Sequence, residues 1–278
     1  MTAVFLARPA RASTPLDERL QTLARESSGT VGLYARKMGR ASALALNADD
    51  VFPTASVAKL LILLALFRYA EKHGPSVFDE RITLKYADFV GGSEVLDAYE
   101  PGSVFTIDRL ARAMIEQSDN TASNVLIDYV GFDRIRRTIS QAGLRHTQLK
   151  RHFMDVNAIA HHSENLTTAR DMGTLLYQIE RGAHEGIATV ASPRSCRKMI
   201  DILLRQEDRD KIARGLPLGT PLANKTGEID GVRNDAGIVD PYGESPYVIV
   251  VLTKDLGDFS LGNMAIRKIA SAVNGAFN

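Results

Sequence analysis

The longest apolar run of the chain, residues 60–67, lies inside a segment from 57 to 73 that is apolar on nearly every side. A helix with this pattern is buried in the middle of a protein, and the Gly-Pro pair at 74–75 ends it. The run is far shorter than the ~20 residues that a membrane-spanning helix needs. The pattern therefore predicts one central buried helix and no membrane span.

Short segments typical of β-strands occur towards both ends of the chain, and turn residues separate them. They lie at 30–36, 43–46, 222–225, 236–240 and 247–252. Apolar residues at helical spacing flank these strands at 16–27 and 264–273. Strands at both ends indicate one antiparallel sheet assembled from both ends of the chain.

The middle of the chain shows only helices and loops. Gly143 and Gly182 are expected to close two of its helices. The predicted helices are 107–117, 121–129, 132–142, 168–181 and 194–205. We therefore expect an α+β fold, an antiparallel sheet flanked by helices with an all-helical lobe inserted between its N- and C-terminal strands. The expected domains are 1–54 with 208–278 for the sheet and 55–207 for the helical lobe, and the active site is expected at their junction.

Composition adds few constraints. The 278 residues include 34 basic and 33 acidic side chains, and the net charge of +1 predicts no binding to nucleic acid or to an anionic membrane. Cys196 is the single cysteine, so an intrachain disulfide is not possible. The N-terminus lacks the basic and apolar regions of a secretory signal. This favours the cytoplasm slightly, although the sequence leaves the compartment unknown.

Three short motifs carry candidate chemistry: Ser-Val-Ala-Lys at 56–59, Ser-Asp-Asn at 118–120 and Lys-Thr-Gly at 225–227. Ser56 begins the most apolar helix, and Lys59 lies one turn further along the same face. A helix N-terminus carries partial positive charge that suits an oxyanion, and burial lowers the pKa of a lysine towards that of a usable base. The first motif thus predicts a nucleophile with its base.

Each motif also has a structural interpretation. Ser56 suits a helix cap, residues 118–120 suit the N-cap of the next helix, and 225–227 suits an edge strand running into a turn. A second Ser-x-x-Lys, at 195–198, lies in a polar, amphipathic stretch without a following Ser-Asp-Asn. The occurrence of all three motifs in order, at spacings suited to separate elements, favours an enzyme that acylates its own serine.

Together with Asn124, these motifs make the chain similar to the serine β-lactamases and penicillin-binding proteins, and most similar to class A β-lactamases. The resemblance runs from about Leu16 to the C-terminus. It implies that Ser56 is the nucleophile and Lys59 its proton acceptor or relay. It also implies that Ser118 passes a proton to the leaving nitrogen, and that Asn120 holds Lys59 and the substrate's side-chain amide.

The same resemblance assigns substrate binding to the third motif. Lys225 and Thr226 would bind the substrate carboxylate, with Gly227 beside them in the substrate-binding strand. The backbone N–H groups of Ser56 and Glu228 would form the oxyanion hole. A monomer acting on a small β-lactam or a peptide-like substrate is expected, without a cofactor.

One departure from class A concerns the base for deacylation. The family carries a glutamate in an omega-shaped loop, and here Phe153 stands at that place. A phenyl ring accepts no proton. Asp155 is the nearest carboxylate that could replace the glutamate, and a loop or helix-cap role is its alternative. Glu164 is a poorer candidate, and Asn165 replaces the aspartate that would pair with Arg151.

A metal site is not expected. His146, His152, His161 and His162 lie near Asp155 and Glu164, but without a recognisable ligand spacing, so a solvated loop is the prediction. The chain also has no Gly-x-Ser-x-Gly elbow, P-loop or dinucleotide fingerprint.

Three functions remain open. The first is a serine β-lactamase-like hydrolase, acylated at Ser56 and hydrolysing the acyl-enzyme slowly or efficiently. The second is a penicillin-binding D-Ala-D-Ala peptidase or an esterase of the same fold. The third is a non-catalytic binding protein, which has no need of the set Ser56, Lys59, Ser118 and Lys225. We expect the first.

Overall fold

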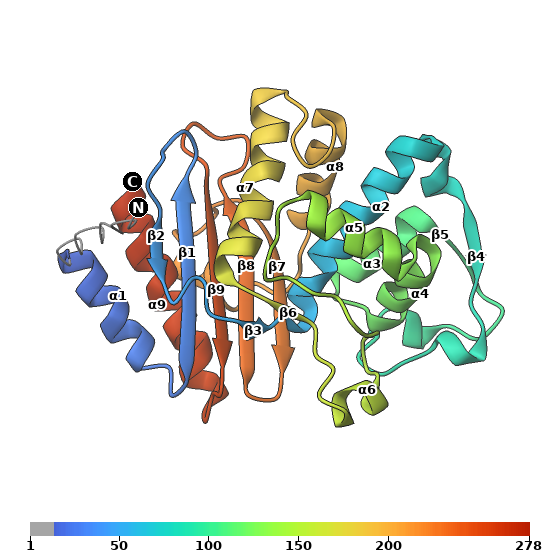
Figure 1. Ribbon diagram of the computed structural model, residues 1–278, viewed down its shortest axis with the longest axis horizontal. Helices are drawn as coiled ribbons and strands as arrows, with labels where there is room; N and C mark the ends of the chain where they lie inside the picture. Colours follow the sequence, from blue (N-terminus) through green and yellow to red (C-terminus); the bar gives the residue numbers. More distant parts are fainter. Residues whose placement is uncertain (1–13) are drawn as a thin grey trace, which may run out of the picture.

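A five-stranded antiparallel sheet forms the centre of the computed structural model, which describes residues 14–278. The strand order is β2-β1-β9-β8-β7 (Figure 1). The first strands pair with the last, because β1 lies antiparallel to β9 from Thr30 opposite Lys254 to Lys37 opposite Tyr247. The strands are β1 (Thr30–Lys37), β2 (Leu44–Leu46), β7 (Leu222–Ile229), β8 (Val232–Val239) and β9 (Tyr247–Lys254).

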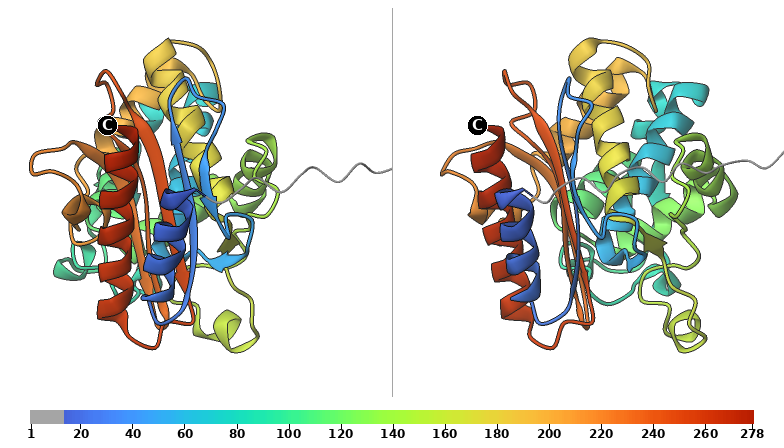
Figure 2. Two further views of the ribbon diagram at one scale, coloured as in Figure 1. Left: turned by 90° about the vertical axis from the view of Figure 1, so that its left-hand side faces the viewer. Right: turned by 60° about the vertical axis from the view of Figure 1, so that its left-hand side comes forward.

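Helices cover both faces of this sheet. The first and last helices, α1 and α9, pack together on one face, and α7 lies on the other against β1 and β9 (Figure 2). The α+β fold predicted above, with its sheet built from both ends of the chain, is confirmed. The helices are α1 (Pro15–Arg25), α2 (Lys59–His73), α3 (Ile107–Glu116), α4 (Asn120–Val130), α5 (Phe132–Gln141), α6 (Val156–Ala160), α7 (Ala169–Glu185), α8 (Pro193–Leu203) and α9 (Phe259–Phe277).

Two short strand pairs lie outside the central sheet, and the pair at 81–83 and 104–106 lies within the middle segment that was expected to contain only helices and loops. The segment β3 (Phe52–Pro53) pairs with β6 (Leu166–Thr167), and β4 (Arg81–Thr83) pairs with β5 (Val104–Thr106). The 3₁₀ turn Ala55–Ala58 connects β3 to α2. Four further 3₁₀ turns lie at Pro75–Asp79, Tyr86–Asp88, Leu96–Ala98 and Ile212–Gly215.

The central helix α2 is buried as its pattern predicts. Every residue from 59 to 67 is buried, and residues 60–67 belong to a hydrophobic core that extends to β8 and β9. Burial of each large apolar side chain contributes about 1.5–3 kcal/mol to folding. The first residue of this helix, Lys59, is therefore anchored against the core with none of its own surface exposed.

Several element boundaries were predicted wrongly: β8 begins at Val232 and not at 236, and α9 extends over Phe259–Phe277 and not over 264–273. Two further differences bear on helix packing and on the third motif. The helix expected to end at Gly182 continues to Glu185 and is closed by Gly186, which has the left-handed φ of 68°. Gly182 faces α8 instead, where an added Cβ would lie 2.6 Å from the Cys196 Sγ. Its lack of a side chain thus serves close helix packing and not helix termination.

The third motif lies inside a strand and not at its end. The strand expected at 222–225 continues to Ile229, because Thr226 to Ile229 pair with Asp235 to Val232 in a tight hairpin with β8. As the outermost strand, β7 borders the helical part of the molecule. The motif residues are therefore held by a regular ladder of backbone hydrogen bonds on one side only.

None of the helices within residues 14–278 is long and apolar enough to cross a membrane. The prediction about a secretory signal falls on residues 1–13, outside the described residues. The division into a sheet domain and a helical domain stays a prediction.

Candidate active site

The turn that carries Ser56 is fixed from two sides. The Thr54 amide donates to the Asn165 carbonyl at 2.9 Å, and the Asn234 side-chain amide donates to the Pro53 carbonyl at 2.9 Å. Ala55 has a φ of 44°, which is sparsely populated for a residue with a side chain. The helix proper begins only at Lys59, so Ser56 lies in the 3₁₀ turn before it. This support holds the serine at the rim of a cleft.

Lys59 lies under that rim with none of its surface exposed. Its Nζ donates to the Asn120 Oδ1 at 2.8 Å, to the Ser118 Oγ at 3.1 Å and to the Ser118 carbonyl. Burial and the positive charge of Lys225 lower the pKa of Lys59 well below its usual value, and the charge of Asp119 offsets only part of this effect. These surroundings therefore favour the neutral amine, the form of Lys59 that can accept a proton.

The second motif lies in the loop between α3 and α4. Ser118 adopts a φ of 61°, and its hydroxyl and the Asn120 amide both contact Lys59. Asp119 points away and caps α4 by accepting from the Ala122 amide at 2.8 Å. The capping interpretation thus applies to Asp119, whereas the residues on either side of it face the cleft.

The third motif forms the opposite wall. Lys225 has no exposed surface and donates to the Thr226 carbonyl at 2.8 Å. Burial lowers the pKa of Lys225 to about 7, against the attraction of Asp208 and Asp235. Lys225 therefore lies beneath the cleft, whereas Thr226 and Gly227 line it.

Gly227 brings this wall against the Ser56 turn. A Cβ at residue 227 would lie 3.0 Å from the Ser56 backbone nitrogen and 3.0 Å from the Thr54 carbonyl oxygen. Both are backbone atoms, which cannot rotate away as the end of a side chain can. Only glycine therefore permits the strand to approach the backbone N–H group that the oxyanion hole would use.

Gly227→Ala should accordingly lower the rate of Ser56 acylation while the protein stays folded. Displacing a wall of an active site by about 1 Å can cost about 10²-fold in rate, and a fall of about ten- to a hundredfold is expected here. The rate constant with penicillin G measures it. Gly275→Ala, at an exposed site with nothing within 4 Å of the added Cβ, is the control. Equal rates in the two variants would contradict the close approach.

The cleft between these walls has a volume of about 420 Å³. The structure brings most of the predicted site residues to its lining and leaves Lys59 and Lys225 beneath it, while their chemical roles stay predictions. The lining residues are Ser56, Gly92, Glu94, Glu116, Gln117, Ser118, Asn120, Gln206, Glu207, Asp208, Thr226, Gly227 and Glu228.

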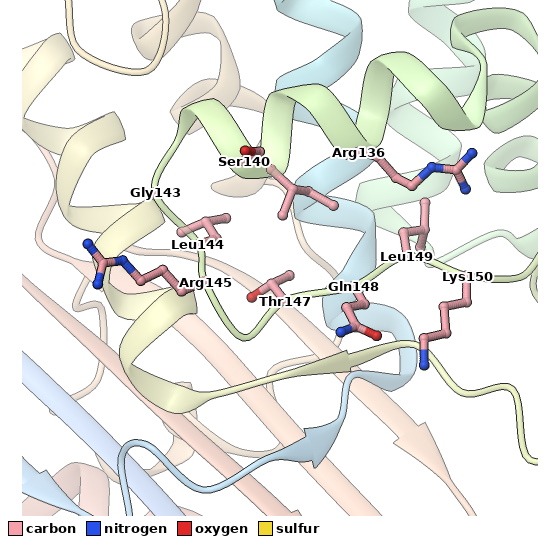
Figure 3. A pocket seen from close by; sticks show the side chains of 10 residues that line it. Arg136, Ser140, Gly143, Leu144, Arg145, Thr147, Gln148, Leu149 and Lys150 are labelled. Carbon is pink, nitrogen blue, oxygen red and sulfur yellow. The ribbon is translucent and has the colours of Figure 1, made fainter.

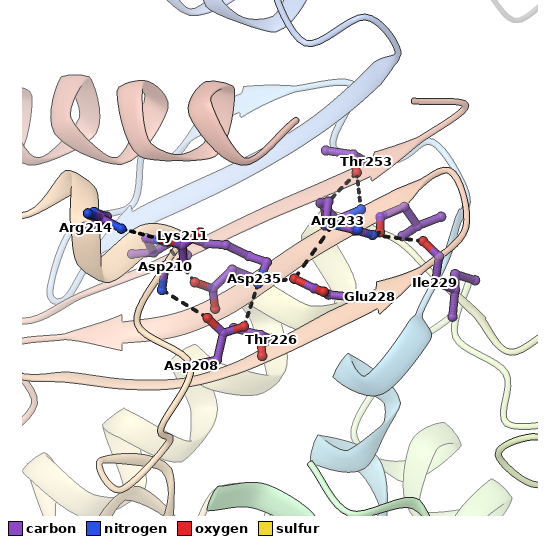
Figure 4. Close-up of polar contacts among 12 residues, drawn as sticks. Asp208, Asp210, Lys211, Arg214, Thr226, Glu228, Ile229, Arg233, Asp235 and Thr253 are labelled. Carbon is purple, nitrogen blue, oxygen red and sulfur yellow. Dashed lines mark hydrogen bonds and ion pairs between the residues drawn. The ribbon is translucent and has the colours of Figure 1, made fainter. Parts of the chain in front are cut away.

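Sequence reasoning missed an ion-pair network around a buried lysine beside this cleft. The Lys211 ammonium contacts the Asp208 and Glu228 carboxylates, each at 2.6 Å (Figure 4). Burial alone would lower the pKa of Lys211, but these two carboxylates outweigh it and raise the pKa above its usual value. Lys211 belongs to no motif, and only the fold brings its loop to β7.

Phe153 lies directly beside the predicted base. Its ring centroid is 4.7 Å from the Lys59 Nζ, and the side chain is 8% exposed. Asn124 holds the Phe153 backbone, accepting from its amide at 2.8 Å and donating to its carbonyl at 3.0 Å. The loop therefore points an apolar ring, and not a carboxylate, at Lys59.

The other residues of this loop have structural partners. Arg151 pairs with Glu164 at 2.7 Å, so Glu164 takes the place of the aspartate that Asn165 replaces. Asn165 accepts from the Arg151 amide at 3.1 Å. Asp155 caps α6 by accepting from the Ala158 amide at 2.9 Å. It lines a separate hollow of about 270 Å³ with Phe153, and its role as a base stays a prediction.

Several candidates lie away from the cleft. His152 contacts the Asp128 carboxylate at 2.8 Å, and within residues 14–278 no cluster of three or more potential ligands is arranged to hold a metal. Ser195 is buried in the first turn of α8, where its hydroxyl accepts from Ser192 at 3.2 Å. A further hollow, of about 460 Å³, lies beside α5 near Arg136 and Lys150 (Figure 3) and contains no motif residue.

Comparison with known proteins assigns the chain to a family. The model of the family described as "Beta-lactamase enzyme family" matches residues 15–277. A β-lactamase of Streptomyces fradiae is 30% identical over 248 residues, which are 86% of this chain and 78% of that protein. A β-lactamase of Bacillus cereus is 27% identical and spans 83% of this chain and 71% of its own.

Solved structures give the same result. A mutant of PBP-A, in an acyl-enzyme complex with penicillin G, has a TM-score of 0.84 and 31% identity over 98% of this chain and 99% of that one. A β-lactamase of Sphaerobacter thermophilus also has a TM-score of 0.84 and 31% identity, over 95% of this chain and 96% of that one. The chain belongs to the beta-lactamase enzyme family.

Proposed function

We propose that β-lactams acylate this serine hydrolase of the class A β-lactamase type at Ser56 and that the resulting acyl-enzyme is hydrolysed slowly. One observation carries the proposal. Lys59 is buried, contacts Ser118 and Asn120, and has an aromatic ring where a water-activating carboxylate would be expected. These contacts equip the site for acylation and leave deacylation without an evident base.

Acylation can proceed with these groups alone. The Ser56 Oγ attacks the β-lactam carbonyl while its proton passes to the neutral amine of Lys59. The backbone N–H groups of Ser56 and Glu228 stabilise the resulting oxyanion. As the carbon–nitrogen bond breaks, the Ser118 hydroxyl donates a proton to the nitrogen. Lys59, 3.1 Å from the Ser118 Oγ, then returns its proton to that oxygen.

A penicillin-binding peptidase is the second candidate. The presence of Phe153 beside Lys59 favours it, and so does the similarity to PBP-A, whose mutant was solved as a penicillin acyl-enzyme. A non-catalytic binding protein is disfavoured. Complete burial of an ammonium group, as at Lys59, is costly, and a pKa lowered by such burial is typical of a catalytic site. One chain supplies every group named, so we expect an active monomer.

A stopped reaction with penicillin G tests the proposal. The full chain is mixed with the antibiotic, quenched at intervals and measured by intact-protein mass spectrometry. We expect one covalent adduct with the full mass of penicillin, which peptide mapping places on Ser56. No adduct at any time, together with no loss of penicillin from the solution, would contradict the proposal.

Lys59→Ala and Lys225→Ala should fail in different ways. Losing the proton acceptor should slow acylation at saturating penicillin, by about 10²–10⁴-fold. Losing the buried cation beneath the cleft should mainly raise the penicillin concentration needed for half-maximal rate. Rates measured over a range of concentrations separate the two effects. An equal loss of the saturating rate in both variants, with an unchanged concentration dependence in Lys225→Ala, would argue against these roles.

A further inference from the structure

Lys211 and Arg233, two cationic side chains beside the cleft, are already paired with carboxylates of the protein. Lys211 is 1% exposed and binds both Asp208 and Glu228 at 2.6 Å (Figure 4). The Glu228 side chain is 47% exposed and lines the cleft, so it lies between the buried ammonium and any bound molecule. An anionic substrate would therefore meet the Glu228 carboxylate before it could reach the charge of Lys211.

Two cationic side chains at this wall also have hydrogen-bond partners within the protein. Lys225 donates one hydrogen bond to the Thr226 carbonyl at 2.8 Å. Arg233 donates to the carbonyls of Ile229 at 3.1 Å and Val232 at 2.8 Å. A substrate carboxylate that approached Lys211 would have to displace Asp208 or Glu228, and it would leave a protein carboxylate without its cation.

The residues that line the cleft also carry negative charge. Its described residues include five carboxylates and neither a lysine nor an arginine. Glu116 has a partner in Arg112 at 3.3 Å, and Glu207 hydrogen-bonds to Gln117, whereas Glu94 has no ion pair among residues 14–278. Like charges at a few ångströms repel one another, and more strongly where the surroundings exclude water. The lining carboxylates therefore oppose an anion at the mouth of the cleft, above the buried Lys59 and Lys225.

We propose that the enzyme prefers acyl donors without a free carboxylate beside the scissile bond, that is, neutral or cationic amides and esters, and that Glu228 sets this preference by holding Lys211. The inference rests on the proposed acylation of Ser56. It concerns the Glu228 side chain only, since the backbone N–H of residue 228 is the group expected at the oxyanion.

Penicillin G and its methyl ester form a matched pair of probes, because they differ only in the charge of that carboxylate. Rate constants for acylation of the full chain are measured by intact-protein mass, and the two adducts differ by the mass added on esterification. We expect the wild type to react with the methyl ester at least as fast as with the free acid. Glu228→Gln should shift the ratio of the rate constants about tenfold towards the free acid, as expected when a close like charge is removed.

Glu94→Gln is the matched control. It removes the same charge from the same lining but frees no buried lysine, and it should move the ratio by no more than about twofold. Circular dichroism checks that each variant is folded. A ratio that shifts equally in both variants, or in neither, would overturn the assignment to Glu228.

Ionic strength provides a test that needs no variant. If the cleft repels an anion, added salt should accelerate acylation of the wild type by the free acid and leave the methyl ester unaffected. A wild type that reacts faster with the free acid, and that salt slows, would overturn the inference while leaving the acylation of Ser56 intact. Failure of both compounds to label Ser56 would instead overturn the proposed function, and the inference with it.

Discussion

Ser56→Ala should abolish covalent labelling of the protein by penicillin G and leave the fold unchanged. The side chain is half-buried at the cleft rim, and its hydroxyl forms no hydrogen bond within residues 14–278, so its loss removes no structural contact of that kind. The backbone N–H groups stay in place without a nucleophile to use them. Removing a nucleophilic serine costs on the order of 10⁶-fold in comparable enzymes, so intact-protein mass should show no adduct.

Ser195→Ala is the matched control, because Ser195 begins the second Ser-x-x-Lys of the chain. It is buried in the first turn of α8 and bonds to Ser192, so we expect this variant to be labelled as fast as the wild type. Circular dichroism and thermal unfolding establish that both variants fold. Labelling that survives in Ser56→Ala, or that maps to Ser195, would remove Ser56 from the role of nucleophile.

Most of the fold could be predicted from local sequence patterns, because tertiary contacts override these patterns at few positions. The apolar run at 60–67 predicts the buried helix α2, and the β-rich segment at 247–252 predicts the core of β9. Gly182 shows where such reasoning fails. Glycine ends a helix where a left-handed conformation is needed, but it also occurs where two helices touch, and the sequence does not distinguish these cases. The position of Cys196 on α8 decides it.

The candidate site could likewise be predicted only in part. The motif residues were found because their identity and order carry the signal, and the fold brings Ser56, Ser118 and Thr226 to one cleft as the motifs suggest. The pairing of Lys211 with Glu228 was not predictable, since it joins a loop to a strand without any fixed spacing. The pairing of Arg151 with Glu164 was missed because the resemblance places the partner of Arg151 one residue further on, where this chain has Asn165 and not an aspartate.

The loop beside Lys59 leads to the second large effect: in wild-type protein, penicillin should acylate Ser56 faster than water releases it. Acylation has Lys59 and Ser118 to move protons. The attacking water has no assigned base, because Phe153 presents a ring 4.7 Å from the Lys59 Nζ. General-base assistance is worth about 10²–10⁴-fold, so its absence should appear as a burst of one equivalent followed by slow turnover. Rapid-quench mass spectrometry measures both phases.

Phe153→Glu should then accelerate the slow phase, by up to about 10²–10⁴-fold if the carboxylate reaches the water. The backbone at this residue is held on both sides by Asn124, so the substituted side chain should leave the loop in the same direction. Phe153→Leu is the matched control, because it removes the ring without adding a base. It should leave the slow phase within a few-fold of the wild type, and equal acceleration in both variants would show that the ring acts by excluding water.

Lys59 also determines how Phe153→Glu behaves with pH. A carboxylate beside this ammonium favours its charged form and should raise the pKa of Lys59, which burial and Lys225 lower in the wild type. Acylation by the variant should therefore require a higher pH, while deacylation becomes faster at neutral pH. If the wild type instead turns over with no burst and no adduct, another base is at work, and Asp155→Asn becomes the decisive variant. Full turnover in that variant would eliminate Asp155, because the carboxamide accepts no proton at the pH of the assay.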